Sequence, residues 1–286
     1  MPSLIDIRRR IRSVKNTQQI TKAMKMVSAA KLRRAQDRVI AARPYAALLR
    51  EVLGNLAAAA ASDERAASSP MLANRPENRI EMLFFTSDKG LAGAFNSNLI
   101  KASQKFFADH ANAEMHLVLV GRKGRDYYRK RHGTITGEHI NVLGKIQYSE
   151  AAAIARVTTQ RFIDGEIDAV YALNNDFKSV MSQKLSMSRL LPVQAPEQAE
   201  NRDYIFEQPP LDMLERLLPR YLEVEVYRAM LETSAAEHAA RMTAMDSASS
   251  NAGDVIDTLT LNMNRVRQAA ITKEIIEVVS GASASE

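Results

Sequence analysis

A long helical pattern at each end of the chain is the feature that most limits its fold. From Ser3 to about Ala61, apolar residues recur at the alternating three- and four-residue spacing of a coiled-coil seam. A helix of that length would extend roughly 87 Å at ~1.5 Å per residue, and no compact domain buries such a helix along its whole length. The N-terminal segment therefore needs a partner helix.

The middle of this first segment departs from the strict heptad frame. There the apolar residues move to Ile20, Met24 and Val27, and they return to frame at Leu32. We therefore expect the buried stripe to shift onto these three residues. The frame itself falls on four polar residues, namely Gln18, Thr21, Lys25 and Ser28.

A second helical pattern, from about Leu211 to Ser280, can supply the partner. Because one long helix stands at each end of the chain, we predict an antiparallel coiled coil within the chain. The final turns are rich in Ile and Val, which are rarely left in water as a group and predict an association site. The expected seam and the apolar end comprise Val255, Leu259, Met263, Val266 and Ala270, then Ile275, Ile276, Val278 and Val279.

The intervening residues alternate between strand and helix patterns. Strands are expected at 80–85, 114–120 and 168–173, with a further edge strand at 188–193. Helical patterns separate them and end near residues 107, 131 and 164. The predicted fold class is α/β, with a small, open and mostly parallel sheet between the coiled-coil helices. The expected domains are 1–61 (first coiled-coil helix), 62–78 (linker), 79–208 (central domain) and 209–286 (second coiled-coil helix).

Charge is concentrated in one part of the chain. Residues 1–50 hold 13 Lys and Arg against 2 Asp and Glu, a balance of +11, whereas the remainder has a balance of −5. This asymmetry indicates a polyanionic partner. A nucleic-acid-binding coiled coil is one hypothesis, because phosphate contacts would explain the basic segment. Against it, no aromatic residue precedes Tyr45 and the C-terminal end is apolar.

Motifs of catalytic and metal sites are missing from the sequence. There is no cysteine, and the five histidines have no HxxxH or HExxH spacing. Gly90 and Gly93 form a turn between a strand and a helix, where a nucleotide phosphate could bind, but neither GxGxxG nor GxxxxGK[ST] is present. We interpret this segment as a structural turn and predict no cofactor, no metal and no enzymatic activity. A nucleotide-dependent α/β enzyme remains a second rival.

Three segments resemble the signature segments of the gamma subunit of F-type ATP synthase. They are "NTQQITKAMKMVSAAKLRRAQ", "TSDKGLAGAFNSNL" and "NRVRQAAITKEIIEVVSGA", which occur in the family's order. "RPYA" from Arg43 and "ARMTAMDSASSNAGDVI" from Ala240 are also similar to family segments. One departure is Ala92, where the family commonly has cysteine. The resemblance covers essentially the whole chain.

The resemblance implies a rotor, present once per complex, whose coiled coil enters a ring of alpha and beta subunits. Its central domain is expected to meet the epsilon subunit and the membrane-embedded c-ring, in a complex that also holds delta. Arg267, Gln268 and Thr272 are expected to contact the beta subunits. The basic residues Lys22, Lys25, Lys31, Arg33 and Arg34 are expected to face acidic loops of the same subunits.

Two further groups of residues carry over from the family. "DYIFEQ" matches the segment near epsilon and the c-ring, which assigns Tyr204, Phe206 and Glu207 to that contact. Asp88, Lys89, Gly90 and Gly93 match the family's turn motif. No signal-peptide pattern or membrane-spanning run is present, so we expect a peripheral protein on the cytoplasmic face of the bacterial inner membrane.

Overall fold

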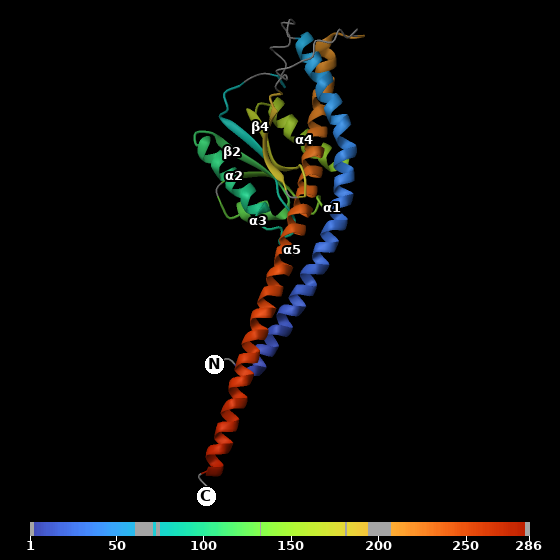
Figure 1. Cartoon of the computed structure of the whole chain (residues 1–286). Helices are drawn as coiled ribbons and strands as arrows, with labels where there is room; N and C mark the ends of the chain where they lie inside the picture. The colour runs from blue at the N-terminus through green and yellow to red at the C-terminus, as the bar shows by residue number, and fades with distance from the viewer. Residues whose placement is uncertain are drawn as a thin grey trace. The chain divides into compact units, whose positions relative to one another are not determined.

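The computed structural model describes residues 3–60, 71–72, 75–131, 133–180, 182–193 and 207–283. Its two longest elements are α1 (Leu4–Ala60) and α5 (Pro210–Ser283), and they confirm both predicted terminal helices (Figure 1). The chain divides into two compact units. The first, which we call the shaft unit, joins residues up to Ser28 with those from Arg241 onward; the second, the domain unit, comprises Ala29–Ala240. Each long helix therefore contributes to both units.

The domain unit contains a five-stranded sheet in the order β3-β2-β1-β4-β5. The central strand β1 (Arg79–Phe85) runs parallel to β2 (Glu114–Val120) on one side and to β4 (Ala169–Phe177) on the other. β3 (Thr134–His139) is parallel to β2, and only β5 (Gln183–Leu191) is antiparallel to its neighbour. This mixed, mostly parallel sheet confirms the predicted α/β class.

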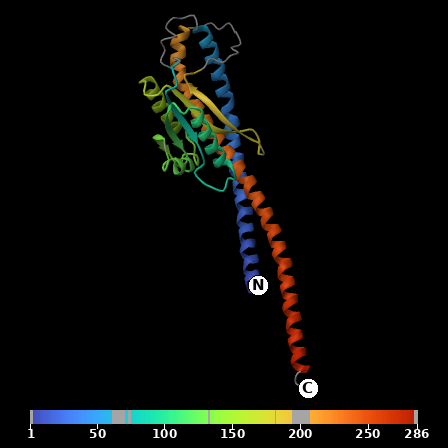
Figure 2. The same cartoon turned by 90° about the vertical axis from the view of Figure 1, so that its left-hand side faces the viewer.

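Three shorter helices cover the two faces of the sheet. α2 (Phe95–Asp109) and α3 (Arg122–Tyr128) connect strands that step outward from β1 to β3, so right-handed crossovers place both on one face. α4 (Tyr148–Ile163) leads back across β1 to β4 and lies on the other face (Figures 1 and 2). Because β1 is covered on both faces, its last six residues are buried, Glu81 among them.

Two edge strands differ from the prediction. β3 was not predicted, because its sequence TITGEH has one large apolar residue and its side chains alternate between exposed and half-buried. β5 begins at Gln183, five residues before the expected start, and ends at Leu191. Edge strands need only one side chain in two to face the core, so neither segment has a continuous apolar run.

In the shaft unit, the heptad frame continues through the polar positions. Ile20 is 60% exposed and Val27 56% exposed, so the expected shift of the stripe onto them is wrong. Thr21 and Ser28 are buried instead. The polar side chains are tolerated because α5 provides partners: the Gln18 amide donates to the Ser249 carbonyl at 3.1 Å, and the hydroxyls of Thr21 and Ser249 are 2.6 Å apart.

The C-terminal helix follows the same frame with one correction. Val255 is 46% exposed, and the adjacent Ile256 takes the half-buried position. The other expected seam residues of α5, namely Leu259, Met263, Val266 and Ala270, are half-buried as predicted. A two-stranded coiled coil buries two positions in seven, so an error of one residue exchanges a seam position for a solvent position.

The polar seam leads to a prediction about stability. Replacing Gln18 with Leu should raise the free energy of unfolding by about 1 kcal/mol. The burial of an apolar side chain at a seam position contributes more than the single hydrogen bond that the Gln18 amide donates to Ser249. Thermal unfolding of the full chain, followed by circular dichroism, measures the change. Gln19→Leu is the matched control, since Gln19 is exposed and the same substitution there buries nothing. A Gln18→Leu variant less stable than Gln19→Leu would contradict the prediction.

A second prediction concerns Tyr148, whose hydroxyl donates a 2.6 Å hydrogen bond to Glu223 of α5. Burial and this anionic acceptor raise the pKa of Tyr148 to about 12. The unfolded chain therefore loses this proton first, and stability present below pH ~10 should be lost as pH rises toward the folded pKa. Tyr148→Phe should unfold more easily at pH 8 but show a shallower decline through this window.

Denaturant unfolding at a series of pH values between 8 and 12 measures both effects. Tyr127→Phe is the control, because the Tyr127 hydroxyl accepts an exposed hydrogen bond from Gln104 and, in the described part of the chain, donates to no carboxylate. Equal slopes for the Tyr148→Phe variant and the unmodified chain would refute the proposed role of this hydroxyl.

Candidate functional site

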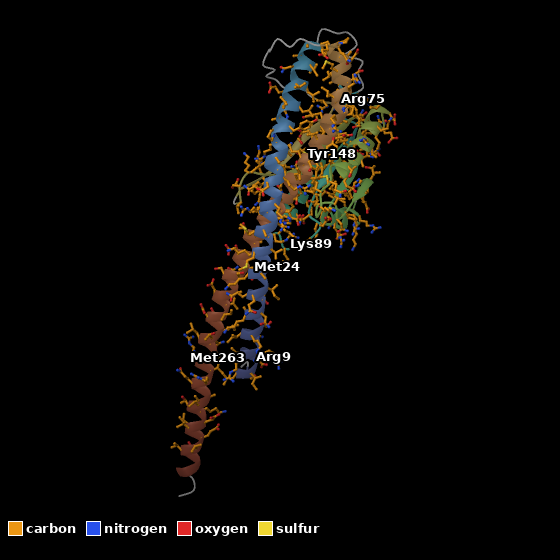
Figure 3. All side chains as sticks on the ribbon, turned by 90° about the vertical axis from the view of Figure 1, so that its right-hand side faces the viewer. Arg9, Met24, Arg75, Lys89, Tyr148 and Met263 are labelled. Carbon is orange, nitrogen blue, oxygen red and sulfur yellow. The ribbon has the colours of Figure 1, made fainter. Side chains whose placement is uncertain are left out.

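The C-terminal end of α5 extends past the start of its partner helix. Lys25 pairs with Asp246 and Gln18 with Ser249, so the helices run antiparallel, and Leu4 at the start of α1 lies level with about Met263. Figure 3 shows Arg9 and Met263 on adjoining helices near this point. Every residue from Ile271 to Ser280 is exposed. The last turns of α5 therefore form a single helix.

This single helix is apolar on much of its surface. Ile275 is 57% exposed and Val278 is 72% exposed, and Ile271, Ile276 and Val279 are exposed as well. Exposed aliphatic side chains gathered on one short segment mark an association surface, because leaving them in water is unfavourable. The geometry agrees with the association site expected from the sequence.

The three residues assigned to beta-subunit contact lie at the start of this segment. Arg267, Gln268 and Thr272 are all exposed, within two turns of α5. The Thr272 hydroxyl donates to the main-chain carbonyl of Gln268 at 2.9 Å, and the side chain of Gln268 is exposed. No carboxylate in the described ranges forms an ion pair with Arg267. Its guanidinium is therefore available to donate a bidentate pair to an external carboxylate.

The basic residues of α1 divide into two groups. Lys25 sits at a seam position, where its ammonium group pairs with the Asp246 carboxylate at 2.6 Å, so its charge is partly satisfied within the chain. The other four are exposed, and they project from α1 into solvent: Lys22 in the shaft unit, and Lys31, Arg33 and Arg34 in the domain unit. These four positive side chains are therefore available to attract an acidic partner, as the charge of the segment indicated.

The segment matched to the epsilon and c-ring contact is only partly described. Tyr204 and Phe206 lie outside the described residues, whereas Glu207 is exposed just before α5 begins. The assignment of these three residues therefore stays a prediction.

Asp88 connects the ends of three strands. Its carboxylate accepts hydrogen bonds from the main-chain amides of Arg122, at 3.0 Å, and Asn141, at 2.9 Å. The first of these amides begins α3, so Asp88 occupies the position at that helix terminus where a bound phosphate would receive hydrogen bonds. The carboxylate of Asp88 therefore satisfies an amide at the start of α3, whereas the Gly90–Gly93 turn leads into α2.

The rest of the turn is shaped by its backbone. The Lys89 carbonyl accepts a 2.7 Å hydrogen bond from the Ser87 hydroxyl. Leu91 and Gly93 have positive φ angles of 63° and 56°, and Gly90 lies beside the Lys123 side chain. The left-handed conformation at two of three consecutive residues explains the glycine at position 93, since glycine adopts it without strain. These contacts support the interpretation as a structural turn.

Metal-ligating geometry is not found in the described part of the chain. No three His, Asp or Glu side chains there are grouped closely enough to hold an ion. Burial lowers the pKa of His139, although the nearby Glu150 carboxylate opposes the shift.

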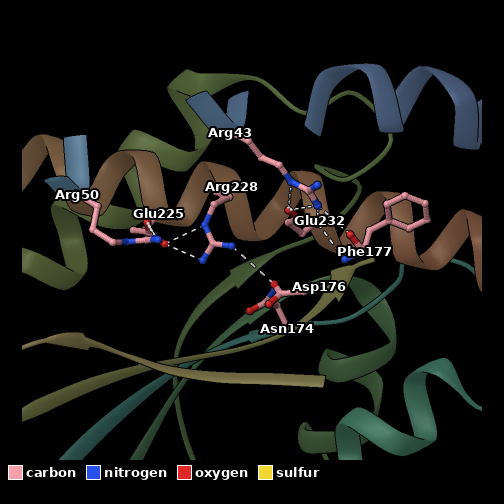
Figure 4. Close-up of polar contacts among 8 residues, drawn as sticks. All are labelled: Arg43, Arg50, Asn174, Asp176, Phe177, Glu225, Arg228 and Glu232. Atoms are coloured by element: carbon pink, nitrogen blue, oxygen red, sulfur yellow. Dashed lines mark hydrogen bonds and ion pairs between the residues drawn. The ribbon is translucent and has the colours of Figure 1, made fainter. Parts of the chain in front are cut away.

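Sequence reasoning missed two buried carboxylates on α5. Glu232 accepts a bidentate hydrogen bond from Arg43 of α1 and a further one from the Phe177 amide at the end of β4 (Figure 4). Seven residues earlier, Glu225 pairs with Arg50 of α1 at 2.7 Å. Arg43 and Arg50 are seven residues apart, and so are Glu225 and Glu232. On two antiparallel helices this shared spacing can align both pairs, and it was the signal available in the sequence.

Comparisons with known proteins give the family. The model of the ATP synthase family matches residues 3–284. The ATP synthase gamma chain of Solibacter usitatus is 67% identical over the full length of both chains. The gamma chains of Anaeromyxobacter sp. (strain Fw109-5) and Desulfitobacterium hafniense are 50% and 48% identical, over 99% and 100% of this chain and equal shares of theirs.

Solved structures agree with the fold. A chain in the central stalk and c-ring structure of the Tetrahymena thermophila mitochondrial ATP synthase has a TM-score of 0.63 at 26% identity, covering 80% of this chain and 99% of that one. A chain of the Euglena gracilis mitochondrial ATP synthase has a TM-score of 0.69 at 19% identity, covering 98% and 94%, and supports the fold alone. The resemblance expected from the three sequence segments is thereby confirmed, and the chain belongs to the gamma-chain family of ATP synthases.

Proposed function

We propose that this chain is the central rotor of an ATP synthase, a non-catalytic subunit that couples ion movement through a c-ring to ATP synthesis or hydrolysis on the beta subunits. The observation that carries the proposal is the full-length match to gamma chains together with a coiled coil that ends in a single apolar helix. The relative from Tetrahymena is described as part of a central stalk and c-ring.

An asymmetric shaft explains how one chain can control several equivalent sites. A single chain inside a ring of three alpha–beta pairs contacts each pair through a different surface, so the three sites differ in nucleotide affinity. Turning the shaft exchanges these states among the pairs. The chain does not bind nucleotide in this scheme, which fits a Gly90–Gly93 turn that has neither nucleotide-binding spacing.

The contact with the ring combines a directional and a non-directional part. Arg267, with Gln268 and Thr272 beside it, is suited to a specific charge-assisted contact with a beta subunit. The exposed Lys22, Lys31, Arg33 and Arg34 provide a diffuse attraction to acidic loops, which tolerates movement past successive subunits. A nucleic-acid-binding role is not supported, because family membership and the apolar end of α5 point to protein partners.

We place the chain at the cytoplasmic face of a bacterial inner membrane, as a peripheral subunit held by the other parts of the complex. Its curated relatives with 67% and 50% identity come from bacteria. Among the described helices, none is both long and apolar enough to cross a bilayer.

A tagged pull-down from membranes stripped at low ionic strength tests the rotor proposal. We expect alpha, beta and epsilon in an active ATPase with one copy of this chain per three alpha–beta pairs. Recovery of the chain alone, or together with nucleic acid, would overturn the proposal.

The tip contact gives a sharper prediction. Arg267→Ala should weaken the contact with the beta subunit by about 1.5 kcal/mol, roughly tenfold in affinity, because a charge-assisted hydrogen bond is lost. Coupled ATP synthesis in membrane vesicles should fall accordingly. Lys273→Ala is the control, since the Lys273 ammonium already pairs with Glu277 at 3.5 Å on the same helix. Equal losses in the two variants would argue against a specific role for Arg267.

Removal of the single helix is the stronger perturbation. A chain that ends after Val266 lacks Arg267, Gln268, Thr272 and the exposed aliphatic residues of the tip. We expect weaker assembly or a loss of coupling, measured as ATP synthesis per assembled complex. Unchanged coupled synthesis with this truncated chain would reject the proposed role of the tip.

A further inference from the structure

In the domain unit, one buried carboxylate of α5 hydrogen-bonds both to α1 and to the end of a sheet strand. Glu232 of α5 has a side chain that is only 3% exposed. Its Oε1 atom accepts hydrogen bonds from Nε and Nη2 of Arg43, at 3.2 and 3.1 Å, and its Oε2 atom accepts one from the main-chain amide of Phe177, at 2.9 Å. Arg43 Nη2 also donates to the Phe177 carbonyl, at 2.8 Å.

These contacts join three separate elements at one point. Arg43 comes from α1, Glu232 from α5 and Phe177 is the last residue of β4. We call the three residues the joint (Figure 4). Each member contacts the other two, so no one of the three elements can move without breaking a hydrogen bond to the others.

A second set of contacts lies two helical turns away. Glu225, 4% exposed at its side chain, accepts from Arg50 of α1 at 2.7 Å and from Arg228 of α5 at 2.8 Å. Arg228 in turn lies 3.7 Å from Asp176, the neighbour of Phe177 in β4. Because 43 and 50, and 225 and 232, are each seven residues apart, both sets lie on the same faces of the two antiparallel helices.

The chemistry of the joint suits the transmission of force. Apolar side chains attract one another without direction, so a sheet packed on helices by apolar contact alone can slide. Charge-assisted hydrogen bonds are short and directional, and a buried carboxylate that loses a donor pays its desolvation cost in full. Displacement of the sheet relative to the helices is therefore opposed most strongly at the joint.

We propose that Glu232 is a positioning residue through which rotation of the sheet is transmitted to the coiled-coil helices, an inference that rests on the rotor function. Torque that enters the domain unit through the sheet must pass to α1 and α5. At the joint both helices hydrogen-bond directly to the main chain of the sheet, through the carbonyl and the amide of Phe177. Loss of the joint should let ATP be hydrolysed with less ion movement per ATP, because part of each rotation is lost between helices and sheet.

The test uses the complete ATP synthase with this chain, reconstituted in vesicles. ATP hydrolysis and ATP-driven ion uptake are measured on the same preparation for Arg43→Ala, after subunit content has been checked. We expect hydrolysis to stay near that of the unmodified complex, while ion uptake per ATP falls by about half or more, since the buried Glu232 loses its partner. The ion uptake per ATP of Arg43→Lys should lie between the values of Arg43→Ala and of the unmodified complex, because one ammonium group cannot reproduce the forked donors of arginine.

The chain contains a closely matched control pair. Arg79, 42% exposed, donates two hydrogen bonds to the buried carboxylate of Asp168, which also accepts a main-chain amide at 2.9 Å. This pair has the same chemistry and a similar burial to Arg43 and Glu232, but it connects β1 to the residue before β4 and touches neither long helix. Arg79→Ala should destabilise the domain while leaving ion uptake per ATP unchanged.

The outcomes separate the inference from the function on which it rests. If the unmodified chain supports no ATP-driven ion uptake in an assembled complex, the rotor function fails. If it does, and Arg43→Ala keeps the normal uptake per ATP, the joint has no role in transmission. Equal losses in Arg43→Ala and Arg79→Ala would also overturn the inference, because general destabilisation would then explain both. If Arg43→Ala does not assemble, Arg43→Lys decides by the same ratio.

A chemical cross-link tests whether the joint acts by transmitting force mechanically or through the charge of its residues. The chain has no cysteine, so Arg43→Cys and Lys178→Cys introduce a unique pair next to the joint, in a complex whose other subunits lack reactive thiols. Lys178 is exposed and follows Phe177 directly. A bismaleimide whose spacer replaces the Arg43 side chain should restore ion uptake per ATP, whereas a monofunctional maleimide should not. Failure of the cross-link to restore uptake would count against mechanical transmission through this point.

Discussion

The seven-residue packing of α1 against α5 is the constraint on which the rest of the structure depends. Two helices of this length are stable only because each covers the seam of the other. The antiparallel arrangement follows from their positions at opposite ends of one chain. It also brings Gln18 to Ser249, and Arg43 to Glu232, although each pair is far apart in sequence. The polar seam is stable for the same reason, because Gln18, Thr21 and Lys25 each meet a polar partner supplied by the other helix.

The charged residues of the two long helices serve two different purposes. In the domain unit, acidic residues of α5 are buried and satisfied by arginines of α1 and by the sheet, so their charge contributes to rigidity and orientation. On the solvent side of α1, Lys22, Lys31, Arg33 and Arg34 remain exposed and create a positive surface. The net charge of the N-terminal segment is therefore a sum of structural and interacting groups, and composition alone does not separate them.

The parts of the candidate site that depend on neighbouring residues alone could be predicted from the sequence. The exposed aliphatic end of α5 and the position of Arg267 follow from the end of one periodic pattern and from three family-like segments. The role of Lys25 could not be predicted in this way, because its seam position and its ion pair with Asp246 depend on the partner helix. The same holds for Asp88, whose hydrogen-bond donors come from segments 34 and 53 residues away.

The sequence by itself determined both long helices, four of the five strands, although β5 starts earlier than expected, and the expected coiled coil, because periodicity, strand-forming runs and helix length are properties of neighbouring residues. The start of α1 is equally local, since Ser3 and Asp6 cap it through reciprocal hydrogen bonds. Only the tertiary structure decided that the heptad frame passes straight through Thr21 and Ser28, that β3 completes the sheet edge, and that Glu232 meets Arg43 and Phe177. Whether a side chain is buried or paired depends on the residues that a distant segment places beside it. A local sequence pattern can therefore indicate which residues are able to form buried or paired contacts, but not which of them do.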